Sequence, residues 1–319
     1  MPGRQTIGVD MGGSKLLAGV VDADLSVHHR TQRPLIGLDQ PALLDLAVEA
    51  VEEARSLSDG EVSAVGFGIP CLIDHRSGRA VMAVNLPLAD LMFAEVMAER
   101  LGLPVFVDND ANLAVVAEHR VGAAVGCREV VMLTVGTGIG GGLILHGELY
   151  RGAVGAGAEL GHMVVDQDGP RCQGNCPNRG CLEAMASGTA LAREAARIAG
   201  ERPDSRLAKA MGGGLPLVGP VVTELAYDGD DAAREVLELI GRRLGIGIAS
   251  LVNAFNPELV VIGGGVMAAG ELLLEPARAE VAARALSPSR DTVRIVMAEL
   301  GVEAGMIGAA ALAFDGLGT

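Results

Sequence analysis

The chain has 319 residues, of which half are apolar and a fifth are charged, and its net charge is −15. This length allows two domains that each bury a core, and the composition is that of a folded globular protein. The acidic balance argues against nucleic acid or an anionic membrane as a partner, because their phosphates would meet no clustered basic surface.

The distribution of apolar residues argues against a secreted protein and against a membrane-spanning one. No apolar run forms before Asp10, so we expect no signal peptide. The most apolar region, residues 244–270, is interrupted by Asn253, Pro257 and Glu258, so we expect no membrane span. These features predict a cytoplasmic enzyme. In that compartment the five cysteines are thiols or metal ligands rather than disulfides.

The first part of the chain alternates strands and helices. The pattern predicts a strand at residues 7–10, a glycine turn at 11–14, a strand at 15–21 and, after a turn at 22–24, a third strand. Helical and strand spacing then alternate in the following order: helix 41–57, strand 62–69, helix 89–101, strand 104–107 and helix 111–120.

The opening pattern returns at Val130, about 125 residues later, again as strand, glycine turn and strand. A repeat at this scale predicts two related halves. The rest is mostly helical, with helices at 187–200, 218–227, 231–253 and 302–314 and a strand at 259–262. We therefore expect an N-terminal α/β domain at 1–112, joined by the C-terminal helix 302–319, and a larger α/β domain at 113–301.

Two glycine turns each follow a buried strand. Glycine lets backbone N–H groups close around phosphate oxygens, and an aspartate before such a turn can hold Mg²⁺. A pair of tight hairpins is the alternative. Neither turn has the P-loop pattern. The candidate phosphate and magnesium residues are Asp10, Gly12, Gly13, Ser14 and Lys15 in the first turn, Gly136, Thr137, Gly138 and Gly140 in the second, and Gly264 and Gly265 after the late strand.

Asn109 and Asp110 follow a strand and open a helix. A carboxylate at the carboxyl end of a strand in an α/β sheet points into the crevice where ligands bind. Phosphoryl transfer to a sugar hydroxyl needs such a group to orient the hydroxyl and accept its proton. The alternative is that one of the two residues only caps the helix.

Three cysteines lie within ten residues, at positions 172, 176 and 181. With His162 as the fourth ligand, their spacing is compatible with a closed Cys₃His zinc site. Glu159 and Glu183, at the two ends of this loop, are candidates to accept hydrogen bonds from sugar hydroxyls. For Cys71 and Cys127 we expect packing roles only.

Taken in order, these motifs resemble those of the ROK family, which groups sugar kinases, bacterial glucokinases among them, with sugar-responsive repressors. The matching motifs are D-x-G-G-S-K from Asp10, N-D-A-N from Asn109, G-T-G-I-G from Gly136, E-x-G-H from Glu159 and G-C-L-E from Gly180. The resemblance implies a duplicated actin-like, ribonuclease-H-type α/β fold that binds ATP and sugar.

The resemblance also implies roles. Asp110 would be the catalytic base, and Asn109, Asp110, Glu159, His162 and Glu183 would bind the sugar. His162 would use different ring nitrogens for sugar and zinc. Asp10 would serve Mg²⁺ and the glycine turns would serve the phosphates of ATP.

Three residues depart from the family pattern. Cys172 lies two residues further upstream than the family's first cysteine, Pro177 replaces a glycine, and Cys71 replaces a glycine in a loop that the family places near the sugar.

The function we expect is phosphorylation of glucose at its 6-hydroxyl by a homodimer or homotetramer. The alternatives are a kinase for fructose, mannose, N-acetylmannosamine or N-acetylglucosamine, a polyphosphate-dependent kinase, or a non-catalytic sugar-responsive regulator. A DNA-binding repressor would carry an N-terminal helix-turn-helix domain; because the first glycine turn follows Asp10 so early in the sequence, we expect no such domain.

Overall fold

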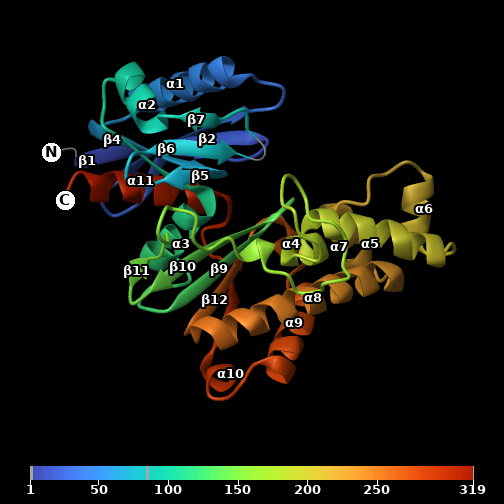
Figure 1. Cartoon of the computed structure of the whole chain (residues 1–319). Coiled ribbons are helices and arrows are strands. Elements are labelled where there is room, and N and C mark those ends of the chain that lie inside the picture. The colour runs from blue at the N-terminus through green and yellow to red at the C-terminus, as the bar shows by residue number, and fades with distance from the viewer. Residues whose placement is uncertain (1–2, 84–85, 319) are drawn as a thin grey trace. The chain divides into compact units, whose positions relative to one another are not determined.

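A computed structural model of the chain describes residues 3–83 and 86–318 (Figure 1). These residues form two compact units. The first contains the chain up to residue 126, residues 142–158 and the chain from residue 299 onward; the second contains residues 127–141 and 159–298. Each unit has its own core.

The first unit is built on a five-stranded sheet with the order β3-β2-β1-β4-β8. β1 runs antiparallel to β2, and β2 runs antiparallel to β3, whereas β1, β4 and β8 are parallel to one another. The carboxyl ends of these three strands therefore meet at one edge, where Asp10 pairs with Gly68 and Ile69 with Asn109. The strands are β1 (Arg4–Met11), β2 (Lys15–Asp22), β3 (Val27–Pro34), β4 (Glu61–Ile69) and β8 (Val105–Asn109).

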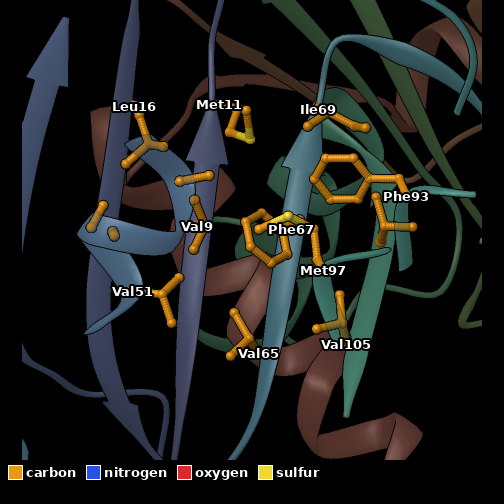
Figure 2. Packing of buried hydrophobic residues seen from close by; sticks show 14 of the residues in the cluster. Val9, Met11, Leu16, Val51, Val65, Phe67, Ile69, Phe93, Met97 and Val105 are labelled. Carbon is orange, nitrogen blue, oxygen red and sulfur yellow. The ribbon is translucent and has the colours of Figure 1, made fainter. Parts of the chain in front are cut away.

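Four helices complete this unit, namely α1 (Gln40–Ser56), α2 (Phe93–Leu101), α3 (Asp110–Val121) and α11 (Ala304–Gly316). α1 and α2 bury their apolar side chains against the sheet (Figure 2). In this core the rings of Phe67 and Phe93 meet edge to face with centroids 5.2 Å apart, a favourable geometry for aromatic rings. α11 contacts β1, β4 and α3.

A small antiparallel sheet, β5 (Cys71–Asp74), β6 (Arg79–Ala83) and β7 (Ala89–Leu91), is also present. It corrects the prediction of a helix over residues 89–101, since Ala89 and Leu91 pair with Met82 and Ala80 of β6. Strand pairing satisfies the backbone groups of residues 89–91, and α2 therefore begins only at Phe93.

The second five-stranded sheet has the order β11-β10-β9-β12-β13. β9 and β12 are parallel, with Gly263 opposite Thr134, so the glycines that follow both strands lie at the same sheet edge. As in the first sheet, a strand, a glycine turn and a neighbouring strand follow one another. The strands are β9 (Val130–Val135), β10 (Ile139–Leu145), β11 (Glu148–Leu149), β12 (Leu259–Gly263) and β13 (Arg294–Met297).

Helices make up most of the second unit. The longest is α8 (Asp231–Phe255). Its N-cap is Asp230, whose side chain accepts from the N–H of Ala233, and its C-cap is Asn256 in the left-handed conformation with φ 47°. The others are α4 (Leu182–Ala186), α5 (Gly188–Glu201), α6 (Arg206–Gly212), α7 (Gly219–Tyr227), α9 (Glu271–Arg284) and α10 (Ser289–Thr292). Short 3₁₀ turns lie at η1 (Leu160–His162), η2 (Gly265–Ala269) and, in the first unit, η3 (Gly301–Glu303).

No helix within the described residues combines the length and the apolar character needed to cross a membrane.

The boundary between the units differs from the one expected near residue 112. The whole of α3 belongs to the first unit, because it packs along α11. At its far end the fully buried Glu118 carboxylate accepts hydrogen bonds from the N–H groups of Glu299 and Leu300 at 3.1 and 2.8 Å. Residues 142–158 also belong to the first unit, where Arg151 Nε donates to Asp108 Oδ2 at 2.6 Å.

Candidate active site

Two carboxylates approach each other at the carboxyl edge of the first sheet. Asp10 is near the end of β1, and Asp110 is the first residue of α3. The pKa of Asp10 is raised to about 7, chiefly by burial and then by the charge of Asp110, while Lys15 at the start of β2 opposes the shift. Like charges held this close favour a cation or a shared proton between them.

Asn109 is the N-cap of α3, as the capping alternative anticipates. Its Oδ1 accepts from the N–H groups of Ala111 and Asn112 at 2.9 and 3.2 Å, and its Nδ2 lies 3.5 Å from the carbonyl oxygen of Cys71. Because the cap occupies the oxygen, the Asn109 amide nitrogen is the group suited to a ligand. The cap also fixes the position of Asp110 at the helix start.

Two buried residues next to the cap, Asp108 and Asn112, are hydrogen-bonded to each other, and the motifs do not predict this contact. Besides its contact with Arg151, Asp108 accepts from Asn112 Nδ2 at 3.0 Å through Oδ1. Asp108 is only 2% exposed, and these partners supply hydrogen bonds to both of its carboxylate oxygens. The buried thiol of Cys71 is nearby, and burial raises its pKa to about 11, which keeps it protonated and consistent with a packing role.

The predicted phosphate residues are divided between the two units. Gly12, Gly13 and Ser14 form the turn between β1 and β2, and Lys15 opens β2. In the second unit, Gly136, Thr137 and Gly138 join β9 to β10, and Gly140 lies in β10. Gly264, with φ 92°, follows β12, and Gly265 begins η2.

The four predicted metal ligands come together in the second unit. The Sγ atoms of Cys172, Cys176 and Cys181 and a ring nitrogen of His162 all lie within 4.8 Å of one another. Cys176 Sγ is 3.8 Å from Cys181 Sγ, and Cys172 Sγ is 3.5 Å from His162 Nδ1. A tetrahedron with Zn–S of about 2.3 Å and Zn–N of about 2.0 Å has S–S and S–N edges of about 3.8 and 3.5 Å. These two separations match the edges of a tetrahedral site, and the shifted Cys172 lies among the four candidate ligands.

Two carboxylates flank this cluster. Glu183 Oε1 lies 3.7 Å from Cys172 Sγ, and Glu159 Oε2 lies 3.9 Å from His162 Nε2, the ring nitrogen not directed at the cysteines. Partial burial raises the pKa of Glu159; His162 opposes this shift, and the charge of Glu183 adds to it. Glu159, His162 and Glu183, all three predicted sugar ligands, thus lie close to one another beside the cluster.

The second glycine turn contacts Glu183 directly. Ile139 donates its N–H to Glu183 Oε2 at 2.9 Å, and a Cβ atom at Gly138 would lie only 2.2 Å from the same oxygen. At Gly161, a Cβ atom would lie 2.0 Å from the carbonyl oxygen of Ile139. The clash at Gly161 is with backbone, so glycine is required there, whereas a side chain at Gly138 would displace the end of the Glu183 side chain. Gly138, which the sequence assigns to phosphate alone, also leaves room for the Glu183 carboxylate.

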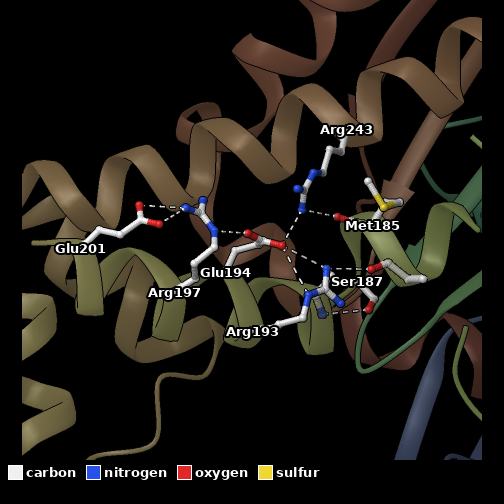
Figure 3. Close-up of polar contacts among 9 residues, drawn as sticks. Met185, Ser187, Arg193, Glu194, Arg197, Glu201 and Arg243 are labelled. Atoms are coloured by element: carbon white, nitrogen blue, oxygen red, sulfur yellow. Dashed lines mark hydrogen bonds and ion pairs between the residues drawn. The ribbon is translucent and has the colours of Figure 1, made fainter. Parts of the chain in front are cut away.

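Glu183 is carried by the short helix α4, and an ionic network holds that helix (Figure 3). The Glu194 carboxylate of α5 accepts from Arg193, Arg197 and Arg243 at 3.2, 2.9 and 3.0 Å. Arg193 also donates to the Ala184 carbonyl at 3.0 Å, and Arg243 lies 3.4 Å from the carbonyl of Met185. Despite burial, which opposes ionisation, these arginines lower the pKa of Glu194 to about 2.

Comparisons with known proteins all point to one family. A protein-family model described as "ROK family" matches residues 6–315 of this chain. The chain is 36% identical to a glucokinase from Thermotoga maritima over the full length of both proteins, and 36% identical to one from Streptomyces coelicolor over 97% of each. Among solved structures, a ROK family glucokinase from Streptomyces griseus in complex with glucose and AMPPNP superposes with a TM-score of 0.87 at 35% identity, covering 98% of this chain and 99% of the other.

Proposed function

The chain belongs to the ROK family, and on that premise we propose that it is a glucokinase that transfers the γ-phosphoryl group of ATP to the 6-hydroxyl of glucose. The observation that carries the proposal is the placement of Asp10 and Asp110 at one sheet edge, where the charge of Asp110 contributes to the raised pKa of Asp10. A kinase of this kind needs one carboxylate for the metal that accompanies ATP and another for the acceptor hydroxyl.

In the proposed reaction Asp110 is the general base. The 6-hydroxyl oxygen forms a bond to the γ-phosphorus, the bond from that phosphorus to the β,γ-bridging oxygen breaks, and ADP leaves with the bond's electron pair. Asp110 orients the hydroxyl and takes its proton. Its position at the start of α3, fixed by the Asn109 cap, keeps the carboxylate in place without rearrangement.

The sugar ligands we propose are Asn109, Asp110, Glu159, His162 and Glu183. Glu159 and Glu183 accept hydrogen bonds from hydroxyls, and His162 offers Nε2. A site built to pair with hydroxyls rejects analogues that lack them, because its buried polar groups are then left without partners. This supports glucose over fructose or N-acetylglucosamine.

The nucleotide ligands we propose are the turns at Gly12–Lys15 and Gly136–Gly140, together with Gly264 and Gly265. Mg²⁺, held by Asp10, would neutralise charge on the phosphates of ATP. The raised pKa of Asp10 supports this role, since a cation relieves the repulsion between Asp10 and Asp110.

We further propose that His162, Cys172, Cys176 and Cys181 hold one structural Zn²⁺. The four protein ligands fill a tetrahedral shell and leave no open position, so zinc would shape the loop rather than activate a substrate. In this arrangement His162 binds the metal through Nδ1 and offers Nε2 toward the sugar.

The remaining parts of the proposal are a cytoplasmic location, a role in glycolysis and a homodimer or homotetramer as the assembly. Light scattering coupled to gel filtration measures the assembly.

The test is a coupled ADP-release assay with glucose, fructose, mannose, N-acetylmannosamine and N-acetylglucosamine, with ATP or polyphosphate as donor. Wild type should prefer glucose and ATP. Asp110→Asn should bind glucose nearly as wild type but lose on the order of 10²-fold or more in kcat, since an amide cannot accept the proton. Faster turnover of another sugar or of polyphosphate would reassign the substrate, and glucose binding without turnover would favour a regulator. Retained activity in Asp110→Asn would refute the base assignment.

A further inference from the structure

The segment between Cys172 and Cys176 reaches the second glycine turn as well as the metal cluster. Gln173 directly follows the ligand Cys172, and its Nε2 donates to the carbonyl oxygen of Thr137 at 3.3 Å and to Ser187 Oγ at 3.2 Å. An amide nitrogen carries two hydrogens, so one side chain can make both bonds. The loop that holds the metal is thereby tied to the turn between β9 and β10.

The start of α5 holds the same turn. Gly188 donates its N–H to the carbonyl oxygen of Gly136 at 2.8 Å. Thr189 Oγ1 lies 2.9 Å from the Thr137 carbonyl oxygen and 3.1 Å from Gln173 Oε1, and its single proton serves one of the two at a time. The carbonyl groups of Gly136 and Thr137 are thus fixed by α5 and Gln173.

This anchoring decides where the N–H groups of the turn point. In a planar trans peptide the carbonyl of one residue and the N–H of the next point in opposite directions. Because the carbonyls of Gly136 and Thr137 point toward α5 and Gln173, the N–H groups of Thr137 and Gly138 point away from them. Successive N–H groups that share a direction form the concave arrangement that binds phosphate oxygens.

We infer that Gln173 is a positioning residue for the nucleotide, acting through the Thr137 carbonyl; this inference rests on the proposed kinase function. The span between the ligands Cys172 and Cys176 contains Gln173 and Gly174, the latter in the left-handed conformation with φ 57°. The metal loop therefore organises the phosphate turn in addition to Glu183 and His162. Removing the metal should weaken the binding of nucleotide as well as sugar.

The experiment compares Gln173→Glu and Gln173→Ala with wild type. Glutamate has the same shape but cannot donate to Thr137 or Ser187, and alanine removes the side chain without adding charge. In both variants the Kd for AMPPNP, measured by calorimetry, should rise about ten-fold, the order expected when one or two neutral hydrogen bonds are lost. The KM for ATP should rise in parallel. Zinc should remain near one equivalent by elemental analysis, and the Kd for glucose should stay within about two-fold.

Gln167→Ala is the matched control, because Gln167 is an exposed glutamine of the same loop region and should change none of these values. A wild-type Kd for AMPPNP in both zinc-loaded Gln173 variants would overturn the inference, and so would an equal loss of glucose and nucleotide binding.

If the Gln173 variants lose zinc or fail to fold, Thr189→Val is the deciding variant. It removes the hydroxyl of α5 that contacts the Thr137 carbonyl oxygen, and it leaves the metal loop unchanged. A raised Kd for AMPPNP supports the inference, and an unchanged one overturns it. The wild-type arm keeps the two proposals apart: absence of glucose phosphorylation with normal nucleotide binding would refute the proposed function and leave the role of Gln173 standing.

Discussion

Replacing Glu194 by glutamine should destabilise the fold around α4 in a pH-dependent way. Glutamine keeps the shape of the side chain but removes the charge that three arginines share. The pKa of Glu194 falls from its ordinary 4.5 to about 2, and because each factor of ten in proton affinity is about 1.4 kcal/mol, the charged form contributes roughly 3 kcal/mol. The side chains of Arg193 and Arg197 are 40% and 47% exposed, so solvent screens part of this electrostatic contribution. About 2 kcal/mol of stabilisation remains.

The sign of the pH dependence follows from the lowered pKa. The contribution of Glu194 is fully present above the ordinary carboxyl pKa of 4.5 and is lost as the pH falls toward 2. The difference in the free energy of unfolding between wild type and Glu194→Gln should therefore be largest at pH 7 and should narrow below about pH 5.

Urea unfolding followed by circular dichroism, at pH 7 and in steps below pH 5, measures this difference. Glu201→Gln is the matched control in the same helix: Glu201 also pairs with Arg197 but is 59% exposed, so its loss should cost less than about 1 kcal/mol. Equal stability of Glu194→Gln and wild type at pH 7, or a difference that does not change with pH, would refute the reasoning.

Three further predictions concern the site itself. Gly138→Ala should raise the Kd for glucose on the order of 10-fold to 10²-fold as well as the KM for ATP, because its methyl group displaces the Glu183 carboxylate by about 1 Å; an effect on ATP alone would contradict the contact with Glu183. Cys181→Ala and Cys172→Ala should lose zinc, as measured by elemental analysis, and should bind glucose more weakly and be less stable. Cys127→Ala changes a buried cysteine outside the cluster and should keep the metal. Full activity in zinc-free protein would refute a functional role for the cluster. The affinity for Mg²⁺ should rise as the pH passes upward through about 7, where Asp10 loses its proton, and this pH dependence should be weaker in Asp10→Asn. Titration calorimetry at several pH values measures the affinity of both proteins, and a pH-independent affinity in wild type would exclude Asp10 as a ligand.

The sequence predicts the elements whose periodicity is strong. The strands around both glycine turns and the helix that follows Asp110 occupy the expected residues within a few positions. The family and its α/β fold, both predicted from the order of the motifs, are confirmed by the family match and by the similarity to the Streptomyces griseus structure. Short strands such as β7 are not predictable in this way, because three residues cannot show a period and only the pairing with β6 determines their conformation.

The same limit applies to the site. The family motifs predict site roles for Asp110, His162 and Glu183 because the spacing of these residues is characteristic. Gln173 and Glu194 show no such signal, since a single glutamine or glutamate in a polar loop or on a helix is common. Their roles depend on contacts with Thr137, Met185 and other residues that only the folded chain brings near.

The discontinuity of the first unit affects how the protein folds during its synthesis. α11, which contacts β1 and β4, begins at Ala304, so about 180 residues separate it from the end of α3 at Val121. At typical rates of about 5 to 20 residues per second, the ribosome needs roughly 10 to 40 s to produce this stretch. During that time the α11-facing side of β1 and β4 lacks its native cover, whereas the side packed by α1 and α2 is already complete. A nascent chain stalled or truncated before Ala304 would thus leave uncovered the sheet face where the backbone of α11 lies directly against Gly8 and Gly66, and such chains are expected to depend on chaperones until the last helix is released.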